Sequence, residues 1–361
     1  MKKIVDLSGF MFSGKAAVSD ILSEFDKVYV PNNRQEFDLL RVGGGLIDLK
    51  NTVQDWSPVR TFAALERFEK VIAKLSRSVS FSEEFFNVGW DYQKRYPALE
   101  DALKKFLNRI IELEWDSPWP YSELESDSLD LLSARLRLSR NSKKFYIRMA
   151  TNFLLFLSEK VVHRKYLKIH EIHNGIKNYK LISVDRFVEA AQIFVNRIIW
   201  DGIDQNEYQM AVVHNALEPF DPGRNLDLLG PDARCIIVDR DPRDIYATSV
   251  SYQVGFNDNV SLYKAVAGAD NVNTFINRYK IYRSRIRESN HVLRLNFGEV
   301  VLKYEESVTK ICDFLELDQS YHNRKFSAFN PEKSVTNLNM WQNDSFSHLE
   351  ESFNLIKNEC L

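Results

Sequence analysis

Short apolar runs alternate with helical repeats at the amino-terminal end of the chain. The pattern predicts a strand over residues 4–7, a turn over 8–14, a helix from 16 to about 25 and a second strand over 27–30. Uninterrupted apolar runs of this length are typical of buried strands, and apolar residues spaced by three and four are typical of helices. The first unit therefore has the order strand, turn, helix.

The same alternation returns in the carboxyl-terminal half. It predicts strands over residues 210–213, 235–238 and 292–295, and helices over 183–200, 242–252, 274–285 and 301–315. Strands that alternate with helices indicate βαβ units and a mostly parallel sheet. We therefore predict an α/β fold of three layers, a mostly parallel sheet flanked by helices as in P-loop nucleotide-binding proteins, formed by residues 1–50 and 165–361. In such sheets ligands bind at the carboxyl ends of the strands.

Residues 51–164 are predicted to form a large helical insert, with helical spacing of apolar residues from Phe62 to Leu75 and from Leu99 to Leu113. Charge is segregated there, with seven acids and no Lys or Arg in 112–130, and ten basic residues and one acid in 135–168. These stretches are either solvated faces that pair with each other or a basic wall beside an anionic ligand. The aromatic residues of 115–121 either pack a loop or offer platforms for a sugar ring. We expect the insert to be a lid that binds the acceptor.

Composition narrows the function classes. The 48 basic and 50 acidic residues give a net charge of -2, so no global charge favours nucleic acid as a partner. No apolar run approaches the roughly 18 residues of a membrane span, which predicts no integral membrane association. The three cysteines are far apart and form no C-x-x-C motif. Reduced thiols in a cytoplasmic protein are the expectation.

The first candidate site is the turn that reads G-F-M-F-S-G-K-A from Gly9 to Ala16. Glycines let backbone amides point at a phosphate, the following helix N-terminus adds partial positive charge, and Lys15 supplies a full charge. The spacing is that of a Walker A loop, but Ala16 stands where a Ser or Thr usually binds Mg²⁺. The turn is therefore predicted to bind phosphate without ordinary ATP or GTP hydrolysis.

The second candidate site follows the strand at 235–238 and reads R-D-P-R-D from Arg240 to Asp244. Asp241 is a natural N-cap, Pro242 suits the first helical position, and Asp244 stands where a capping box would place an acid. Arg240 thus lies between a buried strand and a helix N-terminus, where its guanidinium forms a fork for a phosphate.

This second stretch resembles the 3′-phosphate-binding segment of sulfotransferases that use 3′-phosphoadenosine 5′-phosphosulfate (PAPS). Arg240 and Thr248 match the arginine and the hydroxyl that hold the 3′-phosphate in that family, and Ser249 is a neighbouring hydroxyl. The first turn then falls where the family binds the 5′-phosphosulfate. The contacts that the resemblance implies there are Gly9, Phe12, Ser13, Gly14, Lys15, Ala16 and Ala17.

Three further segments agree with the family in order and spacing. Residues 212–215 end in His214 and Asn215, where such enzymes often carry a catalytic histidine. Residues 296–301 resemble the segment before the last long core helix. Lys333 and Ser334, followed by Trp341, resemble the carboxyl-terminal segment that folds over the nucleotide. The resemblance covers residues 1–30 and 200–361 and does not reach the insert.

The first turn departs from the family. Phe12, Lys15 and Ala16 stand where the family usually has a cation and two phosphate-binding hydroxyls. Lys15 is expected to supply the lost charge from one turn away, and Ser19 is a weaker substitute for a hydroxyl. This departure leaves open a relative that has lost activity.

The resemblance implies transfer of a sulfuryl group from PAPS to a hydroxyl or amine, with 3′,5′-ADP as the product and no metal. The acceptor is expected to be a small metabolite, a glycan or a lipid-linked sugar. Lys15 is the predicted clamp on the leaving group, and His214 the predicted base, because an unperturbed imidazole titrates near neutral pH.

Two other functions fit parts of the sequence. A P-loop kinase using ATP and Mg²⁺ would take residues 235–239 as a Walker B strand ending in Asp239. A protein that binds 3′,5′-ADP without catalysis would keep the fold alone. A metal site at His163, His170 and His173 has no accompanying carboxylate or cysteine pattern to support it.

Overall fold

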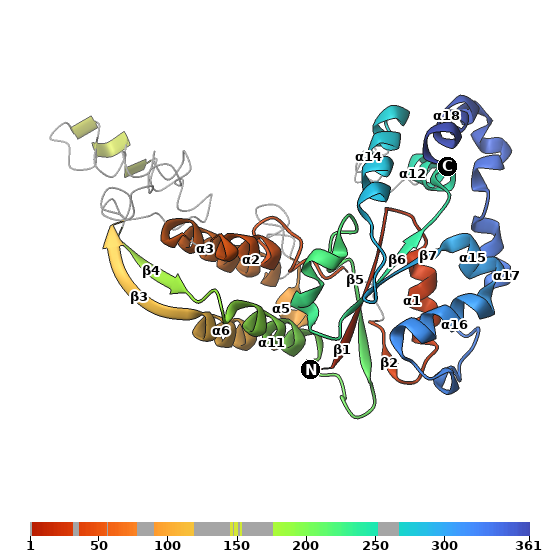
Figure 1. The fold of residues 1–361 in the computed structure, drawn as a ribbon. Helices are drawn as coiled ribbons and strands as arrows, with labels where there is room; N and C mark the ends of the chain where they lie inside the picture. The colour runs from red at the N-terminus through yellow and green to blue at the C-terminus, as the bar shows by residue number, and fades with distance from the viewer. Residues whose placement is uncertain are drawn as a thin grey trace. The chain divides into compact units, whose positions relative to one another are not determined.

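The computed structural model describes residues 2–31, 36–55, 57–77, 90–118, 145–146, 148–150, 152–153, 176–251 and 267–361. The chain divides into two compact units (Figure 1). The core unit consists of Met1–Lys50, Arg95–Phe106 and Val188–Leu361, and the insert unit of Asn51–Lys94 and Leu107–Phe187.

The core unit is built on a five-stranded parallel sheet with the strand order β2-β5-β1-β6-β7. The central strand β1 is buried from Ile4 to Gly9, as its apolar run predicts. The strands are β1 (Lys3–Gly9), β2 (Val28–Tyr29), β5 (Met210–His214), β6 (Arg234–Asp239) and β7 (Val292–Asn296). All five coincide with predicted strands, so the α/β fold is confirmed.

Helices cover the sheet of the core unit on its two faces. Apolar side chains of α1, α15 and α16 pack with those of the sheet into one core, which includes Val18, Ile21 and Ile311. A second group of rings joins Phe10, just after β1, to Phe275, Tyr279 and Tyr282 of α14. The helices are α1 (Lys15–Ser23), α11 (Phe187–Ile199), α12 (Pro242–Ser251), α14 (Val272–Arg285), α15 (Phe297–Leu302), α16 (Tyr304–Leu315), α17 (Pro331–Ser334) and α18 (Glu350–Cys360).

The insert unit contains an antiparallel strand pair as well as helices. Its strands are β3 (Ile111–Pro118) and β4 (Ile176–Ile182), and its helices include α3 (Pro58–Ser76) and most of α5 (Tyr92–Arg95). Two further helices cross the boundary between the units: α2 (Leu46–Gln54), and α6 (Leu99–Ile110), which belongs mostly to the core unit. The rings of Trp115 and Tyr179 stack across the pair with 5.4 Å between their centroids.

The strand pair corrects one sequence prediction. The helix predicted to continue to Leu113 ends at Ile110, where β3 begins. The helical spacing of apolar residues continues by chance to Leu113, but from Ile111 onward the backbone pairs with β4. The partners of these residues lie more than sixty residues further along the chain. Local periodicity carries no information about such a distant partner.

Several predictions concern residues outside those that the structure describes. They are the aromatic positions at 119–121, most of the acidic and basic stretches of the insert, and His163, His170 and His173. Within the described ranges, no helix has both the length and the apolar character needed to cross a membrane.

Candidate nucleotide site

The first turn connects β1 to α1 through two glycines that no other residue could replace without strain. A Cβ on Gly9 would lie 2.3 Å from the Ser13 hydroxyl and 2.7 Å from the Val238 carbonyl oxygen. Gly14 has a φ of +94°, and its Cβ would lie 2.4 Å from the Phe297 ring. The tight path of the chain therefore depends on both glycines.

The turn offers donors to an anion. The first amides of α1, which begins at Lys15, have no carbonyl partners within the helix, although the Ala17 amide donates to the carbonyl oxygen of Gly14 at 2.9 Å. The helix dipole favours negative charge there. The Ser13 side chain is buried, and its hydroxyl has no hydrogen-bond partner among the described residues. A buried hydroxyl without a partner is costly, and an anion at the helix N-terminus would accept its hydrogen bond.

Lys15 faces a carboxylate that the sequence analysis missed. Its Nζ lies 3.3 Å from Oε1 of Glu36, and the guanidinium of Arg41 and the side-chain amide of Asn215 also donate to the Glu36 carboxylate. Burial lowers the pKa of Lys15 despite the nearby acid. For Glu36, burial raises the pKa, but the charges of Lys15 and Arg41 outweigh it, so the pKa lies below its usual value and the carboxylate is ionised at neutral pH.

Glu36 reaches the site because the chain after β2 returns to the end of β5. The Phe37 amide donates to the carbonyl oxygen of His214 at 2.9 Å, and Glu36 forms a parallel bridge with His214. The available signal in the sequence was a pair of acids, Glu36 and Asp38, soon after a predicted strand, at the sheet edge where ligands bind.

The second turn holds Arg240 at the end of β6, with 7% of the residue exposed. Its Nη1 donates to the carbonyl oxygen of Phe12 at 3.1 Å and lies 3.4 Å from the Thr248 hydroxyl. Arg240 therefore bridges the two predicted phosphate turns. Burial lowers the pKa of Arg240, and Asp244 counteracts this with its charge.

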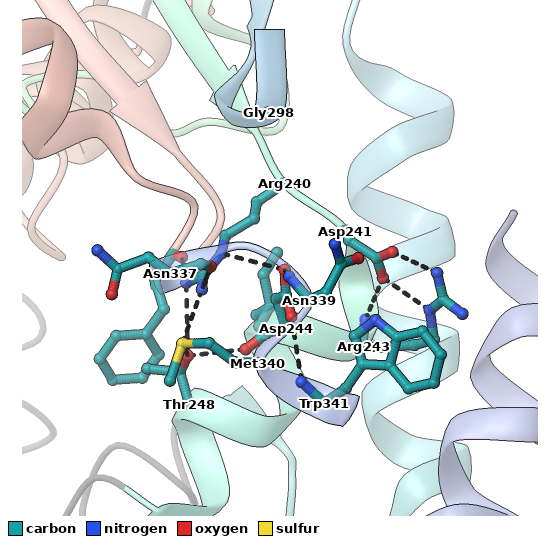
Figure 2. Close-up of polar contacts among 12 residues, drawn as sticks. Arg240, Asp241, Arg243, Asp244, Thr248, Gly298, Asn337, Asn339, Met340 and Trp341 are labelled. Atoms are coloured by element: carbon teal, nitrogen blue, oxygen red, sulfur yellow. Dashed lines mark hydrogen bonds and ion pairs between the residues drawn. The ribbon is translucent and has the colours of Figure 1, made fainter. Parts of the chain in front are cut away.

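Asp241 caps α12 as predicted, since its carboxylate accepts the Arg243 amide at 2.8 Å. Asp244 does not close a capping box. Its carboxylate instead accepts the amides of Asn339 and Trp341 at 3.1 and 3.3 Å, from the carboxyl-terminal part of the chain (Figure 2). The amides of Asn339 and Trp341 thus take the place of the amide at the start of α12 that a capping box would use.

A cavity of about 720 Å³ lies in the core unit where the two turns meet. Its walls include Gly9, Phe12, Ser13, Gly14, Lys15 and Ala16 of the first turn. Arg240 joins them from the second turn, and Glu36, Arg41, Glu218 and Arg278 add four more charged side chains. The site therefore combines four cations with two carboxylates beside a helix N-terminus.

Comparison with known proteins includes the second turn. Residues 181–321 match the sequence profile described as the sulfotransferase family. The resemblance to sulfotransferases is confirmed over these residues, which make up less than half of the chain. The match includes Arg240 and Thr248 and leaves the first turn and the carboxyl-terminal segment outside it.

Two solved sulfotransferase domains were also found. One comes from the Synechococcus PCC 7002 olefin synthase, at 12% identity and a TM-score of 0.36, with 99% of this chain and 88% of that one covered. The other comes from the curacin biosynthetic pathway, at 10% identity and a TM-score of 0.37, with 98% and 95% covered. A comparison with curated proteins gave no significant match.

Not every predicted contact of the candidate site lines the cavity. Thr248 is not among the lining residues, and its hydroxyl donates to the Asp244 carbonyl oxygen at 2.7 Å. Ala17 is buried, and the Ser249 hydroxyl donates to the Ile245 carbonyl oxygen within its own helix. Lys333 is exposed on α17, and Ser334 ends that helix. The roles predicted for these five residues stay predictions.

His214 lies at the end of β5 and is also not among the residues that line the cavity. It is buried, and its Nε2 lies 3.0 Å from the Ser19 hydroxyl. Ser19 is thus engaged below the loop rather than offered to a ligand. The predicted catalytic role of His214 stays a prediction.

Asp239, the metal ligand that a kinase would need, is paired with cations. Its carboxylate accepts from Arg294, lies 3.4 Å from Nη1 of Arg283 and accepts the Tyr282 hydroxyl at 3.3 Å. Two guanidinium groups and a hydroxyl satisfy this buried carboxylate, which leaves it poorly suited to bind Mg²⁺.

Proposed function

We propose that the protein is a PAPS-dependent sulfotransferase, which transfers a sulfuryl group to a hydroxyl or amine and releases 3′,5′-ADP. One observation carries this proposal: Arg240, inside the segment that matches the sulfotransferase family, lies against the phosphate turn at Gly9–Lys15 and lines the same cavity. A nucleotide with phosphates at both its 3′ and 5′ ends would need two such sites side by side.

The residues present fit the donor. The first amides of α1 and the Ser13 hydroxyl would hold its 5′ end, and Lys15 would neutralise charge on the leaving phosphate. Arg240 and Thr248 would hold the 3′-phosphate. When bound, PAPS supplies an activated sulfuryl group together with its leaving group.

A base must remove the proton of the acceptor, and the cavity favours Glu36 over the predicted His214. Glu36 lines the cavity and lies 3.3 Å from Lys15, whereas His214 is buried outside it. The pKa of Glu36 lies below the usual value, so Glu36 is ionised at neutral pH, although the same shift makes its carboxylate a weaker base. Arg41 and Asn215 would fix the direction of its carboxylate.

The acceptor is proposed to be a small molecule or a glycan. The cavity volume of about 720 Å³ is of the size that small-molecule sites have. The net charge of -2 gives no overall electrostatic attraction to nucleic acid, so nucleic acid is not proposed as a partner. The insert is proposed to act as a lid that binds the acceptor.

A thermal-shift titration separates the proposal from its two alternatives. We expect 3′,5′-ADP and PAPS to raise the melting temperature without added metal, because a ligand at 100 times its Kd stabilises the native state by about 2.7 kcal/mol. Stabilisation by ATP and Mg²⁺, with none by 3′,5′-ADP, would instead support the kinase.

A second experiment tests activity. We expect radiolabelled sulfate from PAPS to appear on members of a panel of hydroxylated and amine acceptors. Binding of 3′,5′-ADP without transfer to any acceptor and without consumption of PAPS would identify a non-catalytic binding protein.

A further inference from the structure

A fully buried carboxylate, that of Asp6 in β1, belongs to the core unit and has no part in the mechanism proposed above. Asp6 stands two residues before Ser8, which is also fully buried. Side chains two residues apart on a strand point to the same face of the sheet. Because β1 pairs in parallel with β5, with Asp6 opposite Val213, both side chains can reach the chain where it leaves β5.

Asp6 and Ser8, which we call the bracket, bind the turn that follows β5, residues 215–217. The Asp6 carboxylate accepts the Ala216 amide at 2.8 Å with Oδ1 and the Leu217 amide at 3.3 Å with Oδ2. The Ser8 hydroxyl donates to the carbonyl oxygen of Leu217 at 3.3 Å. The bracket therefore fixes the backbone of this turn from inside the sheet.

The turn has a backbone conformation that needs such support. Asn215 has a φ of +49°, in the left-handed region that residues other than glycine rarely adopt. Its amide donates to the carbonyl oxygen of Leu7 at 3.0 Å, and its side-chain amide donates to the Glu36 carboxylate. The direction of the Glu36 carboxylate thus depends on how the turn is held.

We propose that Asp6 is a positioning residue for Glu36, which it orients through the turn at 215–217. This inference rests on the proposed function, in which Glu36 is the base. Asp6 does not itself touch a ligand, since it is fully buried and is not among the described residues that line the cavity. Its influence passes through the backbone of the turn to Asn215, and from the Asn215 side chain to Glu36.

The bracket accepts both amides only when Asp6 is ionised, because protonation adds a donor to one carboxyl oxygen. Burial raises the pKa of Asp6 from 3.8 to about 7, while the two amides and the charges of Lys15 and Arg41 counteract this shift. On β6, the Cys235 thiol lies 3.9 Å from Oδ2, and burial raises its pKa, so it stays neutral. The hold on the turn is therefore expected to strengthen as the pH rises through 7.

The pH profile of kcat, for transfer from PAPS to a hydroxyl acceptor of the panel above, tests this role in the wild type. We expect kcat to rise through about pH 7 and then to level off. The pKa of Glu36 lies below its usual value, so the titration of Glu36 itself falls below this range.

Asp6→Asn has the shape of the protonated carboxyl and should remove this rise. Its kcat is expected to be about 10-fold below that of the wild type at about pH 8.5, because misplacing a reacting group costs rate. The two proteins should converge below about pH 6, and the variant should still bind 3′,5′-ADP. Ser8→Ala, which removes one hydrogen bond from the turn, is expected to lower kcat by about 2- to 10-fold.

A double-mutant cycle separates positioning from a merely structural role. If Asp6 acts through Glu36, Asp6→Asn lowers the kcat of Glu36→Gln by less than about twofold. A merely structural role would lower kcat by the same factor in both backgrounds. Cys235→Ala is the matched control, because it removes a different contact of the same carboxylate and leaves the amides of the turn bound. Its kcat at about pH 8.5 should equal that of the wild type.

Hydrogen exchange at the amides of Ala216 and Leu217 gives a readout that needs no activity. After correction for the intrinsic exchange rate, protection of these amides in the wild type should increase between about pH 6 and 8. Asp6→Asn should lack this increase, because an asparagine side chain does not titrate.

Three results would overturn the positioning role. They are a rise of kcat through pH 7 that persists in Asp6→Asn, an equal loss of kcat with and without Glu36, and protection at residues 216 and 217 that does not change with pH. Absence of sulfate transfer and of 3′,5′-ADP binding in the wild type, with protection at the two amides still following pH, would instead contradict the proposed function.

Discussion

At the scale of single residues, Glu36 is the proposed base that activates the acceptor. We expect Glu36→Gln to lower kcat for sulfate transfer by about 100-fold or more, because a positioned base contributes on the order of 10² to 10⁴. The affinity for 3′,5′-ADP should stay the same or increase, since the change removes a negative charge 3.3 Å from Lys15. Steady-state kinetics and isothermal titration measure the two effects separately.

His214→Gln is the comparison that separates the two candidate bases. With Glu36 as the base, a His214→Gln protein that retains its melting temperature keeps most of its kcat. A large loss of kcat in this variant, together with normal turnover by Glu36→Gln, would restore the prediction made from the sequence.

Asp6 is expected to make the stability of the core unit depend on pH. Its carboxylate is fully buried in β1 and accepts the amides of Ala216 and Leu217 at 2.8 and 3.3 Å. Burial raises its pKa from 3.8 to about 7, while these bonds counteract the shift. Because the pKa of Asp6 is higher in the folded chain than in the unfolded chain, its protonated carboxyl contributes to stability. This contribution is fully present below pH 3.8 and is lost as the pH rises through 7.

We therefore expect the free energy of unfolding of the wild type to fall, relative to Asp6→Asn, between about pH 4 and 7.5. The difference amounts to at most about 4 kcal/mol, from a shift of about three pKa units. Urea denaturation across this range measures it. Parallel pH profiles for the two proteins would contradict the expected titration.

At the scale of elements, the phosphate turn depends on the backbone of Gly14. We expect Gly14→Ala to destabilise the protein by about 1–3 kcal/mol, because a side chain at positive φ is strained and the Cβ would overlap the Phe297 ring. Gly43→Ala is the control, since its Cβ would meet no atom within 4 Å. Equal urea midpoints for the two variants would contradict the strain at Gly14.

The core elements could be predicted because each carries a local signal. The strands that hold both turns are short apolar runs, and Asp241 and Pro242 mark the start of α12. The strand pair of the insert unit could not be predicted, because β3 owes its conformation to a partner distant in the sequence. The intrinsic preference of a segment for helix or strand is overridden where backbone pairing and ring stacking favour another structure.

At the scale of the whole molecule, the candidate site brings together segments from most of the core unit. Arg240 and Asn337 are 97 residues apart in sequence, and Glu36 and Asn215 are 179 apart. The sequence pointed to both turns because each is contiguous. It missed Glu36 as the partner of Lys15, since Glu36 reaches Lys15 only through the folded chain. The resemblance indicated that the segment from Lys333 to Trp341 folds over the nucleotide, but not that Asn337 and Met340 contact Arg240.

The central claim is that Arg240 recognises a 3′-phosphate, and isothermal titration of Arg240→Lys with 3′,5′-ADP and 5′-AMP tests it most directly. Lysine keeps the charge and loses the planar fork. The account predicts that the wild type binds 3′,5′-ADP about tenfold or more tightly than 5′-AMP. In Arg240→Lys this preference is expected to fall by about 1.4 kcal/mol, while the affinity for 5′-AMP stays unchanged. Equal wild-type affinities for the two nucleotides, or a preference that survives in Arg240→Lys, would contradict it.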